Sequence, residues 1–161
     1  MAVDMFLKLE GIKGESKDAG GHKDEIHIES FSWGVTQQGG FNVGGGGGSG
    51  KVNVHDISIS KYLDKSSALL MSHCCTGKHI PSGLVTFRKA GDKPLEYLKI
   101  KLTDILVSSV QHSGSGHGDV LSENLSLNFA KFEVEYYEQK PDGSGTKAGA
   151  MNYDIKANKG G

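Results

Sequence analysis

The sequence predicts an all-β fold, a compact two-sheet β-barrel with one flanking α-helix and a long glycine-rich extended loop. Most apolar residues alternate with polar ones, which is the period of strands with one buried face. Only one segment, about residues 65–75, has the pattern of a helix. Glycine makes up 24 of the 161 residues, about twice its usual share, and clusters in a few loops. The length predicts a single domain over residues 1–161, large enough to form a core without staples.

Apolar alternation marks the expected strands at residues 3–9, 26–35, 52–59, 85–87, 98–107, 125–136 and 151–155. In four of these regions the alternation slips by one residue, between 28 and 31, 54 and 57, 102 and 105, and 129 and 132. A slip moves the apolar set to the opposite face unless a bulge or bend absorbs it. Two interpretations stay open: strands that bend around a corner, as in a small barrel, or strands that serve both the core and a partner subunit.

One stretch, DKSSALLMSHCCTGK, has helical signals. Asp64 is expected to be the N-cap, apolar residues cluster from Ala68 to Cys75, and Gly77 marks the end. The prediction is a helix of about three turns that covers one open end or side of the β structure.

Composition excludes several classes of function. The formal net charge is -1 and Lys and Arg are scattered, which argues against a nucleic-acid partner. No apolar run is long enough to span a membrane, and the N-terminus lacks the pattern of a secretory signal peptide. Cys74 and Cys75 are the only cysteines and are adjacent, so we expect reduced thiols in a reducing compartment.

The run GGGGGSGK matches the phosphate-loop pattern G-x-x-x-x-G-K from Gly45 to Lys51. That loop requires Ser or Thr after the lysine to hold Mg²⁺, and this chain has Val52. It also requires a following helix whose N-terminus faces the phosphate, whereas residues 52–60 alternate as a strand. The pattern therefore predicts an extended arm that lies close to another backbone, and not nucleotide hydrolysis.

No other motif predicts an enzyme. The seven histidines have no zinc-site spacing, and adjacent cysteines are not a C-x-x-C pair. No G-x-S-x-G nucleophile elbow is present. We therefore predict no catalytic residue, no metal site and no cofactor.

The segment FSWG, residues 31–34, divides its side chains between two faces. Phe31 and Trp33 are expected to pack in the core. Ser32 then faces the other side with Ser30 and Gly34, and such a face, poor in bulk and charge, suits a smooth surface against which other molecules lie.

Five stretches across nearly the whole chain carry a family resemblance: MAVDMFLKLEGIKGESKD, SFSWGV, GGGGGSGKVNVHDISISKYLDKSS, GKHI and ENLSLNFAKFEVEY. They resemble the Hcp family, the haemolysin-coregulated proteins that form the inner tube of the type VI secretion system of Gram-negative bacteria. Differences lie mainly around residues 19–23 and 111–118 and beyond residue 140.

The resemblance implies a structural protein, not an enzyme. It implies a homohexamer with a central pore, stacking of such rings into tubes, a spike protein at the tube tip and a contractile sheath that propels the tube. Effector proteins would sit in the ring lumen, so that the ring acts as their carrier or chaperone. The protein would be cytoplasmic before firing and then secreted (extracellular) without a cleaved signal peptide, with no nucleic acid and no membrane insertion.

The resemblance also implies two functional sites. Ser32, on the lumen-side strand, is the candidate for effector contact. The loop expected to contact a neighbouring subunit or ring consists of Gly44, Gly45, Gly46, Gly47, Gly48, Ser49, Gly50 and Lys51.

A different class of function stays open from the residues alone. A monomeric β-sandwich binding module, for example for carbohydrate, would need exposed aromatic side chains on one face. Electron microscopy distinguishes the two hypotheses, because only the tube subunit forms uniform rings.

Overall fold

The computed structural model describes residues 2–39, 51–91 and 93–161. Within these residues the chain forms mostly strands and a single helix, which confirms the predicted all-β class. The elements are β1 Val3–Leu9, β2 Ile26–Ile28, β3 Ser30–Ser32, β4 Val35–Thr36, β5 Asn53–Val54, β6 Ile57–Tyr62, α1 Ser67–Thr76, β7 Ile80–Lys89, β8 Leu95–Ser113, β9 Ser122–Gln139, β10 Gly145–Asp154 and β11 Lys159–Gly160.

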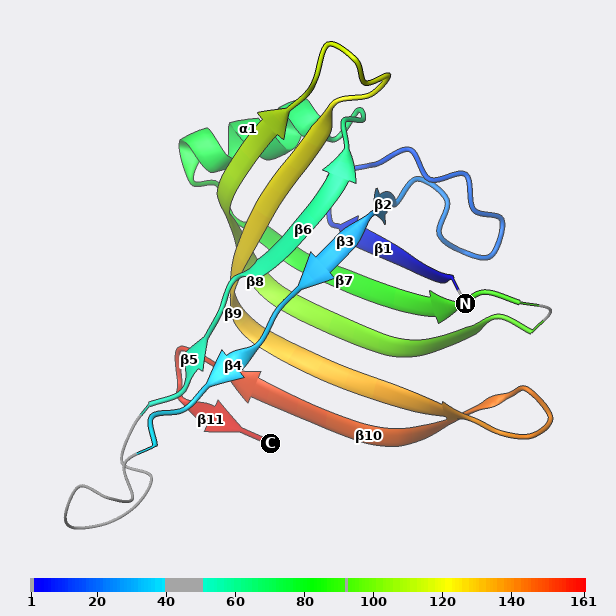
Figure 1. Ribbon diagram of the computed structural model, residues 1–161. Coiled ribbons are helices and arrows are strands. Elements are labelled where there is room, and N and C mark those ends of the chain that lie inside the picture. The colour runs from blue at the N-terminus through cyan, green and yellow to red at the C-terminus, as the bar shows by residue number, and fades with distance from the viewer. Residues whose placement is uncertain (1, 40–50, 92) are drawn as a thin grey trace.

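Nine strands form one strongly curved antiparallel sheet (Figure 1), and β4 and β5 form a separate pair. The main path runs β11-β10-β9-β8-β7-β1-β2, while β6 pairs with both β9 and β3. The sheet is not closed into the predicted two-sheet barrel, because in the described residues no ladder joins β1 directly to β6. Residues 26–32 span this gap: β2 pairs with β1, β3 pairs with β6, and Glu29 N–H donates to the Ser60 carbonyl between them at 2.8 Å.

Two of the four slips in alternation lie inside the long, curved strands β8 and β9, and the other two fall between separate strands. Phe129 and Phe132 flank one slip, yet both are 4% exposed and belong to the same core. Leu102 and Ile105 flank another and are also in that core, with Asp104 between them at φ 56°. At these two positions β8 and β9 bend around one core. A second apolar surface for a partner subunit is therefore not needed to explain these two slips.

Helix α1 packs against β8 through Leu70, which is fully buried. Its end is as predicted: Gly77 adopts φ 69° and its N–H donates to the His73 carbonyl at 2.9 Å. The predicted N-cap was wrong, because Ser66 occupies that position. Asp64 lies two residues earlier and accepts from the Ser66 N–H at 2.8 Å. No helix in the described part of the chain is long and apolar enough to cross a membrane.

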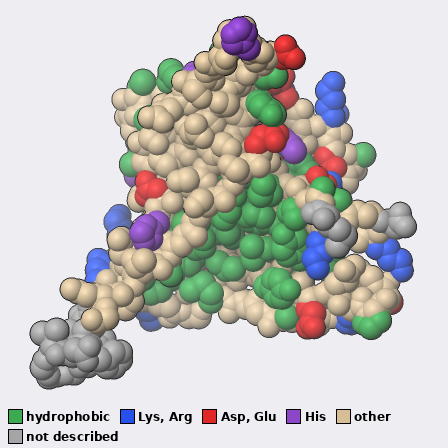
Figure 2. Space-filling model, viewed as in Figure 1, with side chains coloured by type: hydrophobic (Ala, Val, Ile, Leu, Met, Phe, Trp, Pro, Cys, Tyr) green, Lys and Arg blue, Asp and Glu red, His purple; other side chains and the backbone are tan. Residues whose placement is uncertain are grey.

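The apolar core lies on the concave side of the sheet and opens to solvent toward β10. One row of paired residues runs across five strands from Leu7 through Val85, Ile100 and Val134 to Met151. Leu7 is fully buried, whereas Met151 is 45% exposed. Figure 2 shows hydrophobic side chains gathered in the hollow between β3–β6 and the strands β7–β10. The core is therefore covered on the β1 side and uncovered on the β10 side.

Candidate functional site

Small polar side chains form two straight rows across four strands on the convex side of β3, β6, β9 and β8. The first row joins Ser32, Ser58, Ser126 and Ser109, and the second joins Ser30, Ser60, Asn124 and Gln111. We call these eight residues the serine face. The inward neighbours along the same strands are core residues such as Ile59, Leu125 and Val107. The period-2 alternation of the strands thus separates an apolar inner side from a polar outer one.

Hydroxyl groups on neighbouring strands bond to one another across the serine face. Ser30 bonds to Ser60, and Ser109 and Ser126 lie 2.6 Å apart between their Oγ atoms. A bulge in β8 between Val107 and Ser109 brings a further hydroxyl, that of Ser108, within 2.7 Å of Ser126. Each hydroxyl both donates and accepts, so these networks keep capacity for a molecule lying on the face.

The serine face carries no ionisable side chain. A carboxylate, that of Asp56, lies at the margin of the face. It accepts hydrogen bonds from Ser108 at 2.6 Å and from Asn128 at 2.8 Å. The middle of the face is a shallow hollow of ≈ 300 Å³ that all eight of its residues line. The arrangement can offer hydrogen bonds without selecting for charge.

Ser32 is where the sequence placed it, on the polar side of β3 and exposed. Its partners across the sheet are Ser58 and then Ser126. The predicted site did not include Ser109, Gln111, Asn124 or Ser126. Alternation in β9 would have assigned Asn124 and Ser126 to one face, but only the register with β6 unites them with Ser32.

The predicted contact loop lies largely outside the described residues, which exclude 40–50. Of its members only Lys51 is described, and it is exposed just before β5. A contact of this loop with another subunit therefore stays a prediction.

Phe31 and Trp33 pack against the core as expected. The Phe31 ring meets that of Phe87 edge-on at 4.8 Å, and Trp33 contacts Phe132 in the same way at 5.0 Å. The Trp33 indole N–H donates to the His55 carbonyl at 2.9 Å. Because both rings point inward, neither offers the exposed aromatic surface that a carbohydrate-binding module would need.

The histidines and cysteines do not assemble into a chemical centre. Across the described ranges, no group of three or more His, Cys, Asp or Glu side chains is placed to hold a metal ion. His73 donates from Nδ1 to the Leu69 carbonyl at 2.8 Å. Cys74 is partly buried, Cys75 is exposed, and both are free thiols.

Comparison with known proteins identifies the family. A family model described as "Type VI secretion system effector, Hcp" matches residues 6–136. The chain is 53% identical over 145 residues to "Protein hcp1" of Pseudomonas aeruginosa, covering 89% of each chain. The crystal structure of Hcp1 from Salmonella typhimurium is 37% identical, with a TM-score of 0.77 and 99% of each chain covered. A structure titled "Structure of a type six secretion system protein" is 29% identical, with a TM-score of 0.91 over 99% of this chain and 100% of the other.

The fold and the serine face define an all-β protein with one outer face that lacks ionisable side chains. The chain belongs to the Hcp family of type VI secretion system proteins. That family is structural and not a family of enzymes, and membership in it supports a subunit of the secretion system tube.

Proposed function

We propose that this chain forms a homohexameric ring, that its rings stack into the inner tube of a type VI secretion system, and that the serine face lines the lumen. Effector proteins lie against that face, and the ring carries and protects them. The serine face supports this most directly, because it extends over four strands without a charged side chain. Charged surfaces select partners of opposite sign, whereas a neutral hydroxyl surface accepts cargo of either sign.

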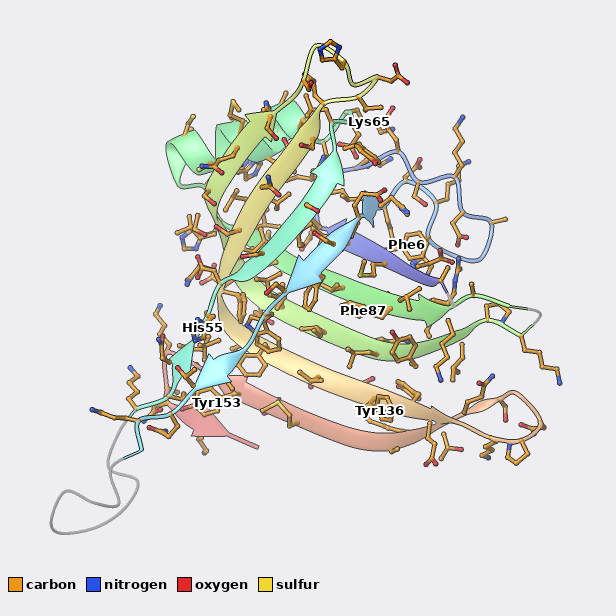
Figure 3. All side chains as sticks on the ribbon, viewed as in Figure 1. Phe6, His55, Lys65, Phe87, Tyr136 and Tyr153 are labelled. Atoms are coloured by element: carbon orange, nitrogen blue, oxygen red, sulfur yellow. The ribbon has the colours of Figure 1, made fainter. Side chains whose placement is uncertain are left out.

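The uncovered side of the core supports a ring interface. Tyr136 and Met151 are each 45% exposed although they continue the apolar inner rows, and Figure 3 shows Tyr136 on the concave side with Phe87. Along β10, only Tyr153 and Asp154 pair with a second described strand besides β9. Open edges and apolar patches favour association, and a head-to-tail contact closes into a ring when its rotation fits a whole number of subunits.

The remaining partners follow from the family. A spike protein caps the tube, and a contractile sheath surrounds and propels it. The protein is cytoplasmic before firing and is then secreted without a cleaved signal peptide. The glycine-rich loop from Gly44 to Lys51 contacts the neighbouring subunit or ring.

Light scattering and electron microscopy of the purified chain test the ring. We expect uniform rings at micromolar concentration, and Met151→Glu should shift them toward monomers because it places a charge in the interface. Thr103→Glu, an exposed change on β8 opposite Lys131 and away from the β10 edge, is the matched control for an added charge. Monomers of the unaltered chain would contradict the ring.

Effector co-purification tests the lumen. Ser32→Trp should leave folding and ring formation intact and reduce effector retention at least tenfold, because the bulk projects from the serine face. Ser32→Ala, which keeps the face small, should retain effector within a few-fold. Full retention by the Trp variant in intact rings would reject the lumen assignment while leaving the ring itself standing.

A further inference from the structure

The loop between β1 and β2, residues 13–25, folds back on itself and lies against the sheet. Gly14 N–H donates to the Asp24 carbonyl at 2.8 Å, and Asp24 N–H donates to the Ser16 carbonyl at 2.8 Å. Two ionic attachments, at Asp18 and at His22, hold this loop on other strands. Both attachments lie beside Phe6 of β1, which is 4% exposed.

His22 lies between two carboxylates. Its Nδ1 is 2.9 Å from Glu25 Oε1 within the loop, and its Nε2 bonds to Glu96 on β8. The ring is 6% exposed and stacks on Phe6, with centroids 4.4 Å apart and planes within 4°. A neutral imidazole has one N–H, so it can donate to only one of these carboxylates. The doubly protonated, cationic ring donates to both carboxylates at once and is the form that this geometry favours.

The second attachment does not change charge near neutral pH. Arg88 on β7 donates to both Asp18 oxygens at 2.9 and 2.8 Å and to Asp4 at 3.0 Å. The Arg88 hydrogen bond lowers the pKa of Asp18 to about 2. Arg88 also lies 5.1 Å from the centroid of the Phe6 ring, so Phe6 contacts cations at both attachments. The Arg88–Asp18 attachment therefore keeps its charges near neutral pH, whereas the attachment at His22 can lose its charge.

Burial alone would lower the pKa of His22, but hydrogen bonds and attraction from Glu25 and Glu96 outweigh it, and the pKa is raised above its ordinary 6.5. A group whose pKa is raised on folding stabilises the folded form below its unfolded pKa. That contribution is lost as pH rises through the folded pKa. The sensitive window therefore lies above pH 6.5, in the range where a histidine can act as a physiological switch.

We propose that residues 13–25 form a pH-sensitive latch, which cationic His22 closes by bridging Glu25 to Glu96 and which opens when His22 loses its proton. Opening leaves the Arg88–Asp18 attachment in place and frees the part of the loop that covers Phe6. It also loosens one wall of a ≈ 760 Å³ cavity with Leu9, Ile12 and Leu69 in its lining. The latch belongs to the single subunit and does not depend on the proposed ring.

The other charged groups near His22 fit this assignment. Glu96 also lies 3.6 Å from Lys99, so it keeps a cation when His22 is neutral. Glu25 has no second ion pair among the described residues. Asp18 feels the His22 charge but remains bonded to Arg88. His27 lies near the same Phe6 ring at 5.9 Å and is exposed, which makes it the natural control.

Hydrogen exchange with mass spectrometry on the full chain, between pH 5.5 and 9 and corrected for intrinsic rates, tests the latch. Peptides covering residues 13–25 should exchange at least tenfold faster above the His22 transition, while those covering β7 stay unchanged. His22→Gln should exchange fast at every pH, and His27→Gln should behave like the unaltered chain. Exchange of the loop that is independent of pH in the unaltered chain would overturn the proposal.

Glu96→Gln gives a second test that does not depend on how well His22→Gln folds. Removing one carboxylate should move both the exchange transition and the His22 titration, followed by nuclear magnetic resonance, to lower pH by at least 0.5 pH units, about threefold in proton affinity. Glu138→Gln, an exposed change on β9, should move neither. A His22 titration that Glu96→Gln leaves in place would also overturn the latch.

Discussion

The long β8–β9 hairpin has two outer faces of opposite character. In the half near β10 the outward pairs are charged: Lys99 lies opposite Glu135, and Lys101 lies opposite Glu133. In the half beside β6 the outward pairs are neutral: Ser109 opposite Ser126, and Gln111 opposite Asn124. The two halves meet near the bend at Asp104 and the bulge after Val107. One hairpin thus supplies an ordinary solvated surface and, beyond the bend, the serine face.

The inner sides reverse this distribution of charge. Beneath the neutral half, Lys61 and Glu123 are fully buried and lie 2.7 Å apart between Nζ and Oε1. Asp64 Oδ1 is a second carboxylate contact of Lys61 Nζ, at 3.0 Å, and His112 Nε2 lies 2.5 Å from Glu123 Oε2. Beneath the charged half, the inner residues such as Leu102 and Phe132 are apolar. This half of the hairpin thus has its charges on the inner side, where they connect β6, β9, β8 and the segment before α1.

Breaking the buried pair should have the largest effect. Lys61→Met leaves the buried Glu123 carboxyl group without its Lys61 partner, and loss of one member of a buried pair costs about 3–5 kcal/mol of unfolding free energy. Urea unfolding at matched protein concentration measures the loss.

The double change Lys61→Met with Glu123→Leu provides the control for that prediction. It removes both buried charges, and apolar replacements of buried pairs are often neutral or stabilising, so most of the loss should be recovered. If the double variant is as unstable as the single one, the unpaired buried charge is not the source of the lost stability. The buried ion pair would then not distinguish the two inner sides in their contribution to unfolding free energy.

Sequence reasoning recovered the parts of this contrast that depend on local pattern. Alternation located the longer strands but not β11. The slip between Phe129 and Phe132 left open a bend or a second apolar surface, and the core that both residues share favours the bend. The small polar side of FSWG was also assigned from alternation, with Ser32 outward.

The buried pair and the extent of the serine face depend on contacts between distant residues. Lys61 and Glu123 occupy inward positions of β6 and β9. A charge of opposite sign at an inward position of each strand was the only sequence signal for a buried ion pair. It could not be used without the register that places Ser60 opposite Asn124. The glycine-rich arm has no alternation at all, so its sequence predicts an extended arm that lies close to another backbone without showing which backbone that is.

Exchanging the outer characters of the two halves should have an intermediate effect. Ser109→Lys with Ser126→Glu copies the Lys99–Glu135 pair onto the serine face. Cross-strand pairs differ by about 0.2–1 kcal/mol, so unfolding free energy should change by less than about 1 kcal/mol and rings should persist. If the serine face lines the lumen as proposed, effector retention should fall several-fold, because the face then selects by charge. The reciprocal change, Lys99→Ser with Glu135→Ser, should leave retention unchanged, and equal losses in both variants would remove the functional distinction between the halves.

The smallest effect is expected for a single outer lysine. Lys101 is exposed on the charged half, and surface changes away from special features usually alter stability by less than about 0.5 kcal/mol. Lys101→Met should therefore unfold within that margin of the unaltered chain, although it is the same chemical change as Lys61→Met. The measurement is again urea unfolding, repeated at low and high salt, because a remaining surface contribution is screened by ions. A loss comparable to that of Lys61→Met would mean that the cost comes from removing a lysine anywhere on the sheet, and not from where the fold places its charge.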